Sequence, residues 1–244
     1  MATGPRARRC RSTHTAAFLV KNISARLPDS PNYGRIARAY RWLEYAAFGS
    51  ALQRSRETFV ERLGSARNIA VFGGGDGRCF KVILRECPVA SIDAYDIDPV
   101  MIAFARRRIP AKDAARVTFH QADARTLTLK AASYDAVITH YFLDCFSTEE
   151  LDALIPKLGA SLRPGGRWLF ADFAIPPASA FPFLRWRARA TIAVLCWFFR
   201  WQVQHPLKQL PPIESKLHQY GWLPQVLREG SGRMVRTVLF AKFH

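Results

Sequence analysis

The stretch Asn68-Ile-Ala-Val-Phe-Gly-Gly-Gly-Asp-Gly-Arg-Cys-Phe80 decides how the rest of the chain is interpreted. Its first five residues, 68–72, predict a short buried strand, because four apolar residues in a row suit a strand that is covered on both faces. Glycine can adopt positive φ and leaves space where a Cβ would stand, and three glycines alternate after the strand: Gly73, Gly75 and Gly77. A helix is expected to begin near Arg78, so its first N–H groups would face the same space. The stretch therefore predicts a corner that can bind a nucleotide.

Three kinds of ligand compete for this corner. A P-loop requires Gly-Lys-Ser/Thr after the glycines, and no such string follows here. A dinucleotide-binding loop has its third glycine three positions after the second, where this chain carries Arg78. The spacing Gly-x-Gly-x-Gly resembles instead motif I of the class I S-adenosylmethionine-dependent methyltransferases. That resemblance implies S-adenosylmethionine as the cofactor, bound beside the three glycines.

A second predicted strand, Ser91–Asp96, ends in an acidic residue. Asp96 stands roughly twenty residues after the glycines, the offset at which an acid reaches a ribose diol. A carboxylate can accept hydrogen bonds from both ribose hydroxyls at once. We therefore expect Asp96 and its neighbour Ile97 to contact the cofactor. Asp98 and Pro99 then predict the N-cap and the first residue of a helix.

Further cofactor contacts depend on the resemblance. In these methyltransferases an acid after the third strand contacts the adenine amino group, and Asp123, followed by Ala124, stands there at the end of a segment predicted as strand and turn over 117–124. A plain turn residue is the alternative for Asp123. Upstream, Asn32–Tyr45 is similar to the D-x-I-A-x-x-Y lead-in of UbiE-like quinone C-methyltransferases, in which the tyrosine covers the cofactor. Tyr40 takes that place here, and an aromatic ring that only packs on the core is the alternative.

The stretch Tyr134–Phe146, predicted as the fourth strand and its exit loop, carries the candidate chemistry. Ligands of open parallel sheets bind beyond the carboxyl ends of the strands, so the exit of this strand should lie beside the transferable methyl group. Thr139 is expected to contact the cofactor. His140 is the candidate general base because its pKa lies near working pH, and Asp144 could orient it. The alternatives are that His140 bonds to the backbone or lies alongside the cofactor, and that Asp144 only precedes the next helix.

Strands that alternate with helices predict an α/β fold with a doubly wound, Rossmann-like parallel sheet. The closing strands, expected over 222–228 and 235–243, fit the seven-stranded sheet with an antiparallel last strand that the methyltransferase resemblance implies. A fifth strand is expected over 167–173. A helix is expected over Ala51–Leu63, and Gly64 is its predicted stop.

The sequence predicts one domain with two additions. Residues 1–30 are expected to form a disordered basic tail, and residues 31–244 a single methyltransferase domain. Within that domain, residues 31–66 are predicted to be a helical N-terminal lid. Residues 174–212 are predicted to be a helical insertion that acts as a lid or as an interfacial segment.

Charge indicates an anionic partner. The formal net charge is +17, and 49% of the residues are hydrophobic, which supports a large core. Arginine and tryptophan alternate with apolar residues over 181–201, a composition typical of a belt at an anionic membrane surface. A lid over an apolar pocket is the alternative for this segment. Its uncharged core, Ala190–Phe199, is too short to span a bilayer.

The five cysteines are scattered, without a C-x-x-C pair or a histidine cluster at ligand spacing. We therefore expect a reducing compartment and no metal. The expected location is the cytoplasm, with peripheral membrane contact as an open alternative. Nucleic acid is not an expected partner, because the Asn/Asp-Pro-Pro-Tyr/Phe motif and a recognisable RNA-binding appendage are both missing.

The expected function is methyl transfer from S-adenosylmethionine to a small, apolar or aromatic acceptor, and three alternatives stay open. The string Gly73-Gly-Gly-Asp-Gly77 also resembles spermidine-synthase-like aminopropyltransferases, although Thr139-His-Tyr-Phe142 replaces their Asp-Ser-x-Asp signature. An RNA methyltransferase is motivated by the charge. A non-catalytic, cofactor-binding assembly factor is motivated by Val71, which replaces the acid often found two residues before the first glycine of motif I.

Overall fold

The computed structural model describes residues 48–176, 181–183, 185–186, 188–191, 193 and 210–242. The chain divides into two compact units, residues 1–46 and residues 47–244, and the description below concerns the second. The predicted tail and the lead-in with Tyr40 lie outside the described residues, as does the part of the insertion from residue 194 to residue 209.

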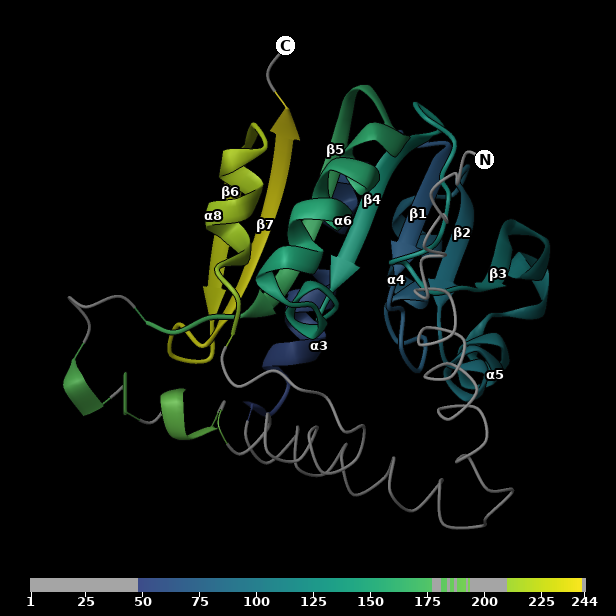
Figure 1. Cartoon of the computed structure of the whole chain (residues 1–244). Helices are drawn as coiled ribbons and strands as arrows, with labels where there is room; N and C mark the ends of the chain where they lie inside the picture. The colour runs from purple at the N-terminus through teal and green to yellow at the C-terminus, as the bar shows by residue number, and fades with distance from the viewer. Residues whose placement is uncertain are drawn as a thin grey trace, which may run out of the picture. The chain divides into compact units, whose positions relative to one another are not determined.

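One seven-stranded sheet organises the described part of the chain, in the order β3-β2-β1-β4-β5-β7-β6 (Figure 1). The first five strands pair in parallel, whereas β7 runs antiparallel to both β5 and β6. This topology confirms the predicted Rossmann-like sheet with its antiparallel last strand. The strands are β1 (Asn68–Phe72), β2 (Ser91–Asp96), β3 (Val117–Gln121), β4 (Tyr134–His140), β5 (Leu162–Phe173), β6 (Trp222–Gly230) and β7 (Val235–Lys242).

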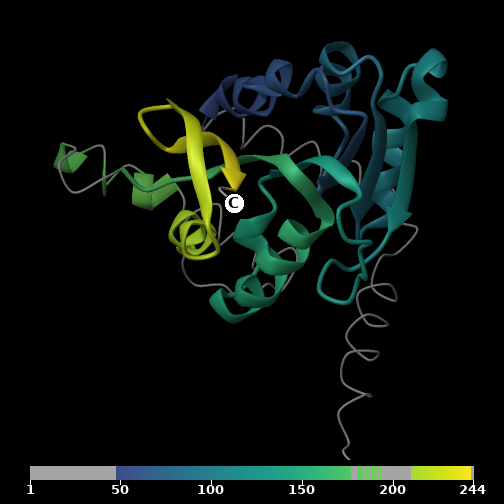
Figure 2. The same cartoon turned by 90° about the horizontal axis from the view of Figure 1, so that it is seen from above.

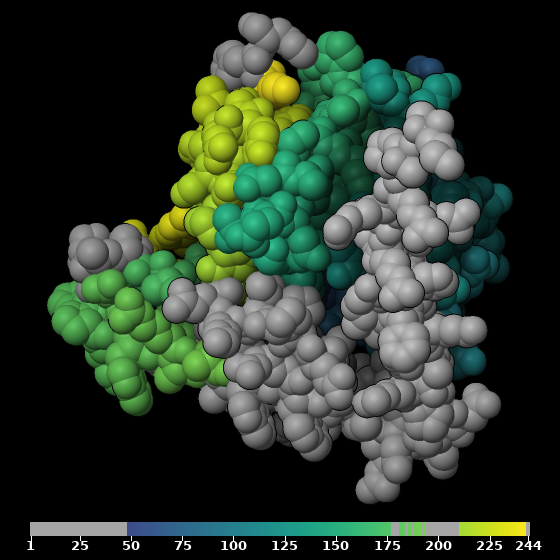
Figure 3. All heavy atoms as spheres, viewed as in Figure 1, coloured from purple at the N-terminus to yellow at the C-terminus, as the bar shows by residue number. Residues whose placement is uncertain are grey.

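Helices cover both faces of the sheet (Figure 2). One face packs on α6 (Thr148–Ser161) and α8 (Ile213–Gln219), which lie side by side in the space-filling view (Figure 3). The other face packs on the 3-10 helix η1 (Val60–Leu63), α4 (Phe80–Glu86) and α5 (Pro99–Arg108). The remaining described elements are α3 (Ala51–Glu57) and the 3-10 helices η2 (Ala111–Arg116) and η3 (Leu143–Cys145).

The residues of β1 explain why the sheet is covered on both faces. Successive side chains of a strand point to opposite faces. Ala70 and Phe72 therefore belong to the apolar cluster on the α6 side, while Ile69 and Val71 belong to the cluster on the α4 side. All four are nearly inaccessible to solvent, so both faces of the strand are buried. The uninterrupted apolar run in the sequence follows from this double burial.

Capping residues define two helix starts, of which the first confirms the prediction from Asp98 and Pro99. The side chain of Asp98 accepts a hydrogen bond of 2.8 Å from the backbone N–H of Val100, and Pro99 is the first residue of α5. At α6, the Ser147 hydroxyl accepts from the Glu150 backbone, and the Glu150 carboxylate accepts from the Ser147 backbone. Each pair satisfies N–H groups that the helix itself leaves open.

The predicted helix over 51–63 is wrong as a single element. It ends at Glu57, where Thr58 adopts an extended conformation and Phe59 has φ of +66°. The Thr58 hydroxyl donates to the Arg54 carbonyl at 2.8 Å, beside the Thr58 backbone N–H, which donates to the same carbonyl at 3.0 Å. The chain then continues as η1, and Gly64 caps that shorter helix.

Strand β5 also differs from its prediction, because it begins at Leu162 instead of residue 167. Leu162 pairs with Tyr134 before the register shifts, and pairing resumes between Ala136 and Arg167. The Leu162 side chain is buried in the cluster on the α6 side, so this irregular start is held by packing.

Candidate functional site

The three alternating glycines form the turn after β1, and all have positive φ: +65° at Gly73, +53° at Gly75 and +85° at Gly77. A Cβ at Gly73 would lie 2.6 Å from the ring of Phe142, and a Cβ at Gly77 would lie 2.6 Å from Cα of Ala105 in α5. A Cβ at Gly75 would meet nothing within 4 Å. The outer glycines therefore permit close packing within the protein, and Gly75 is the glycine of this turn that borders open space.

Asp96 ends β2 beside this turn. Burial raises the pKa of its carboxyl group, and backbone N–H groups of Asp98, Gly75 and Ile97 act in the opposite direction. The Asp98 N–H donates to its Oδ1 at 2.9 Å. The carboxylate is thus held at the edge of the sheet, next to the glycine turn. Ile97 follows it and is 41% exposed.

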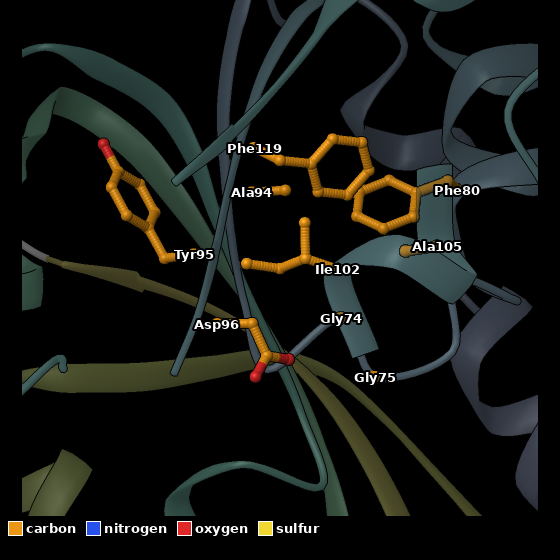
Figure 4. Close-up of a pocket in the computed structure, with 9 residues that line it drawn as sticks. All are labelled: Gly74, Gly75, Phe80, Ala94, Tyr95, Asp96, Ile102, Ala105 and Phe119. Carbon is orange, nitrogen blue, oxygen red and sulfur yellow. The ribbon is translucent and has the colours of Figure 1, made fainter. Parts of the chain in front are cut away.

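A small pocket lies between this edge and the helices α4 and α5 (Figure 4). The Asp96 carboxylate lies beside Gly74 and Gly75, and the rest of the lining is mostly apolar (Figure 4). Tyr95 contributes to the lining, but its hydroxyl points away and bonds to the hydroxyl of Tyr134 at 2.7 Å. The pocket is lined by Gly74, Gly75, Phe80, Ala94, Tyr95, Asp96, Ile102, Ala105 and Phe119.

The exit of β3 joins the same edge, because the Ala122 N–H donates to the Asp96 carbonyl at 2.9 Å. Asp123 follows, and both of its carboxylate oxygens are engaged by Arg125 through the backbone N–H and the guanidinium, at 2.8 to 3.0 Å. Burial alone would raise the pKa of Asp123, but these bonds and the charge of Arg125 outweigh it and lower the pKa. Ala124 is buried in the apolar cluster on the α6 side. An adenine amino group would therefore have to share Asp123 with Arg125.

Thr139 and His140 point to opposite faces of the sheet. The Thr139 hydroxyl is fully buried and accepts a hydrogen bond of 2.9 Å from the indole N–H of Trp168. The Thr139 hydroxyl is thus engaged by a core residue. His140 is 5% exposed, and neither ring nitrogen has a hydrogen-bond partner among the described residues. Burial, and next the positive charge of Arg56, lower the pKa of His140 to about 3. The imidazole is therefore neutral near pH 7 and a weak base.

Asp144 lies in η3 at a half-buried position. The expectation that it orients His140 is wrong in this structure, because no hydrogen bond joins the two side chains. Burial raises the pKa of Asp144 to about 6, and its carboxyl group faces that of Asp172. The Sγ atom of Cys145 lies 3.6 Å from its Oδ1.

Asp172 was not predicted as a site residue. It stands near the carboxyl end of β5, is fully buried, and accepts a hydrogen bond of 2.8 Å from the Phe173 backbone N–H through Oδ1. Burial raises its pKa well above the ordinary value, and the charge of Asp144 raises it further. The sequence did contain a signal, since an acid near the end of an apolar strand at this edge of the sheet repeats the position of Asp96.

Comparison with known proteins matches residues 69–166 to a family described as "Methyltransferase domain". This range contains the glycine turn, Asp96, Asp123 and Asp144. It ends before Asp172.

The proteins similar to the chain include two curated proteins and one solved structure. A demethylmenaquinone methyltransferase of Thermus thermophilus is 29% identical over 151 residues, which are 61% of this chain and 67% of that protein. A spermine synthase of Arabidopsis thaliana is 31% identical over 118 residues, 43% of this chain and 31% of that protein. The Burkholderia thailandensis 1,6-didemethyltoxoflavin-N1-methyltransferase, solved with its substrate and S-adenosylhomocysteine, has a TM-score of 0.62 at 16% identity over 98% of this chain and 94% of that one. The matched segment thus spans about two thirds of the first relative and under one third of the second.

Proposed function

We propose that this chain, which belongs to the class I S-adenosylmethionine-dependent methyltransferases, transfers a methyl group to a small, apolar or aromatic acceptor. The observation that carries the proposal is that Gly75 and Asp96 lie next to each other. Open space in front of a positive-φ glycine lies next to a carboxylate held at the end of β2. A nucleoside needs both features, because its ribose requires a hydrogen-bond acceptor and its tail requires room at the backbone.

The protein's part in such a reaction is mostly alignment. S-adenosylmethionine supplies an activated methyl group on a sulfonium. Asp96 would accept from the ribose hydroxyls, and Ile97 would cover the adenine with its exposed side chain. Holding the acceptor near attack distance contributes roughly 7–11 kcal/mol in favourable cases. A base as weak as His140 would hold a proton poorly, so we propose it as a neutral contact alongside the cofactor instead.

Calorimetry tests the cofactor. Wild-type protein is titrated with S-adenosylmethionine and with S-adenosylhomocysteine, and saturable binding of both is expected. Methyl transfer is then tested with methyl-labelled S-adenosylmethionine and an extract of apolar metabolites, and the labelled product is identified by mass spectrometry. Absence of binding to either ligand would end the proposal, and binding without label transfer would leave the assembly-factor and aminopropyl-transfer alternatives.

Aminopropyl transfer is a second candidate, supported by the similarity to spermine synthase over 118 residues. The segment Thr139–Phe142 lacks the acidic signature expected of such enzymes. Decarboxylated S-adenosylmethionine is therefore the third ligand of the calorimetric series. If it binds more tightly than S-adenosylmethionine, aminopropyl transfer replaces methyl transfer as the function.

We further propose that the protein contacts a membrane surface. Phe181, Phe183 and Trp186 are 78%, 66% and 67% exposed, and the last two rings lie 6.3 Å apart. Arg189 is exposed on the same segment. Aromatic side chains next to arginine suit the boundary of an anionic bilayer. No helix in the described part of the chain combines the length and hydropathy needed to cross a bilayer.

Vesicle co-sedimentation tests this contact. The triple variant Phe181→Ser, Phe183→Ser, Trp186→Ser should lose binding to vesicles that contain anionic lipid. Val89→Ser is the matched control, because Val89 is 66% exposed but lies outside the segment. Equal sedimentation of the triple variant, the control and the wild type would count against membrane contact.

A further inference from the structure

Two carboxyl groups lie near each other at the carboxyl edge of the sheet, and no salt bridge joins either of them to a cation among the described residues. Asp172 is fully buried near the end of β5, and Asp144 lies in η3, the short helix after β4. The two segments are fixed to each other by a hydrogen bond of 2.8 Å from the Tyr141 N–H to the Ala171 carbonyl. This backbone bond places the exit loop of β4 over the end of β5.

Hydrogen bonding shows that the pair needs a proton. Oδ1 of Asp172 accepts from the Phe173 N–H, while its Oδ2 has no donor among the described residues. Both the carboxyl group and the backbone N–H of Asp144 are near enough to Asp172 to act on its pKa, the carboxyl group raising it and the N–H lowering it. Two carboxylates offer acceptors only, so they can form a hydrogen bond only when one of them is protonated. The more deeply buried Asp172 is the one that keeps the proton, and it then donates to ionised Asp144.

The charged and titratable neighbours leave this arrangement intact. The thiol of Cys145 lies beside Asp144, and the Asp96 carboxylate is near enough to that thiol to raise its pKa, after the larger effects of burial, Asp144 and Asp172. Arg236 stands opposite Asp172 in the register of β5 and β7. Its guanidinium, however, is engaged by Glu214 and Glu229 at 2.8 to 3.0 Å. The pair therefore carries a single negative charge near pH 7.

The position of the pair is suited to the acceptor side of the site. Phe142, two residues before Asp144, packs on Gly73 of the glycine turn. Aromatic rings surround the same exit loop, with Tyr141 and Phe173 at 4.9 Å and Phe142 and Phe146 at 5.0 Å. Asp144 is half-buried, and Cys145 next to it is exposed.

We propose that the Asp144–Asp172 pair accepts the proton released by an acceptor that is methylated at an O–H or N–H group. This inference rests on the methyl transfer proposed above. The acceptor's O–H or N–H bond breaks, its electron pair forms the new bond to the methyl carbon, and the S–CH3 electrons return to sulfur. The proton moves to Asp144, which then passes it to water after the product leaves. Asp144 is the base, and Asp172 is a positioning residue that stabilises its charged form by donating a hydrogen bond.

Carbon-13 NMR of protein labelled at its aspartate carboxyl carbons tests the pair without any acceptor. The signals are assigned with Asp144→Asn and Asp172→Asn. At pH 7.5 we expect Asp172 to be protonated and Asp144 to be ionised, with Asp144 titrating near pH 6. If both groups are ionised at pH 7.5, the proposal is overturned.

The pH profile of label transfer tests the chemistry with methyl-labelled S-adenosylmethionine and the metabolite extract. Asp144→Asn should lower the rate on the order of 10²-fold or more and abolish the acidic limb. Asp172→Asn keeps a donor and should stay within a few-fold of wild type. Asp172→Ala removes the donor, so the pKa of Asp144 should rise and the acidic limb should move to higher pH.

Asp152→Asn is the control, because Asp152 is a surface aspartate of α6 paired with Lys216. Calorimetry with S-adenosylhomocysteine shows that each variant is folded and binds the cofactor. Unchanged rate and unchanged acidic limb in Asp144→Asn would overturn the proposal, as would an equal loss in Asp172→Asn. If wild-type protein binds no cofactor, the proposed function itself has failed, which is a separate result.

Discussion

The ring of Phe142 occupies the space that a Cβ on Gly73 would need, because Cδ2 of Phe142 would lie 2.6 Å from that atom. The exit loop of β4 therefore packs directly on the glycine turn after β1. A change in one of these loops has to displace the other. This contact links the side of the site that is proposed for the cofactor with the side that is proposed for the acceptor.

Replacement of Gly73 by alanine should destabilise the protein in two ways. Alanine at φ of +65° costs about 1 kcal/mol, and the clash with Phe142 adds about 1–3 kcal/mol. Gly165→Ala is the control, since Gly165 has φ of +75° but a Cβ there meets nothing within 4 Å. Urea denaturation measures both variants. The double variant Gly73→Ala, Phe142→Leu should recover part of the loss, and simple additivity of the two single changes would contradict the contact.

Replacement of Gly75 by alanine should separate stability from binding. The φ of +53° imposes a backbone penalty similar to that at Gly165, and no atom is near enough to clash. The new methyl group would stand in the open space proposed for the cofactor. Gly75→Ala should therefore lose as much stability as Gly165→Ala in urea, but weaken the binding of S-adenosylhomocysteine at least 10-fold by calorimetry. Unchanged affinity would place the cofactor elsewhere.

Asp96→Asn should stabilise the free protein and weaken its complex. Burial raises the folded-state pKa of Asp96, so the folded state disfavours the charged form, and the uncharged asparagine removes that penalty. The gain in melting temperature over wild type should be present at pH 7.5 and shrink as the pH falls and the wild-type carboxyl group takes up a proton. Loss of a charged acceptor for the ribose should weaken S-adenosylhomocysteine about 10- to 100-fold. Calorimetry and thermal melts with and without ligand measure both effects, and a lower melting point of the free variant would disprove the first.

Asp123→Asn should have the opposite effect on the free protein. Arg125 lowers the folded-state pKa of Asp123, so its charged form contributes stability that is present above the ordinary pKa and is lost as pH falls through the lowered one. The variant should melt below wild type at pH 7.5, and the gap should close at strongly acidic pH. A partly exposed pair of this kind contributes roughly 0.2–1 kcal/mol. An equal gap at both pH values would show that the loss is not electrostatic.

The sequence predicted the parts of the fold that short stretches encode. The bounds of β1 and β2 follow from stretches that end before a glycine and at an acid, and the starts of α5 and α6 follow from caps that act within three residues. The break at Thr58–Phe59 was not predictable in the same way. It depends on a local hydroxyl bond and a left-handed residue, which periodicity does not reveal.

The sequence predicted that the candidate site lies at the carboxyl edge of the sheet, but it did not predict the side-chain contacts within the site. Asp96 and the glycine turn meet, as the order of the strands implies. The engagement of Asp123 by Arg125, the bond from Trp168 to Thr139 and the burial of His140 depend on where side chains lie in three dimensions. Asp172 was missed for the same reason, because its partner comes from another segment 28 residues away in sequence.

Strand β7 lies between β5 and β6, although it comes last of the three along the chain. Until Val235–Lys242 has left the ribosome, the edge of β5 that it later covers has no hydrogen-bonding partner. A nascent chain that stalls before residue 235 therefore presents an unpaired apolar strand, which is prone to associate with other chains. The acid near the end of β5 thus reaches its native surroundings only when translation of the last strand has finished.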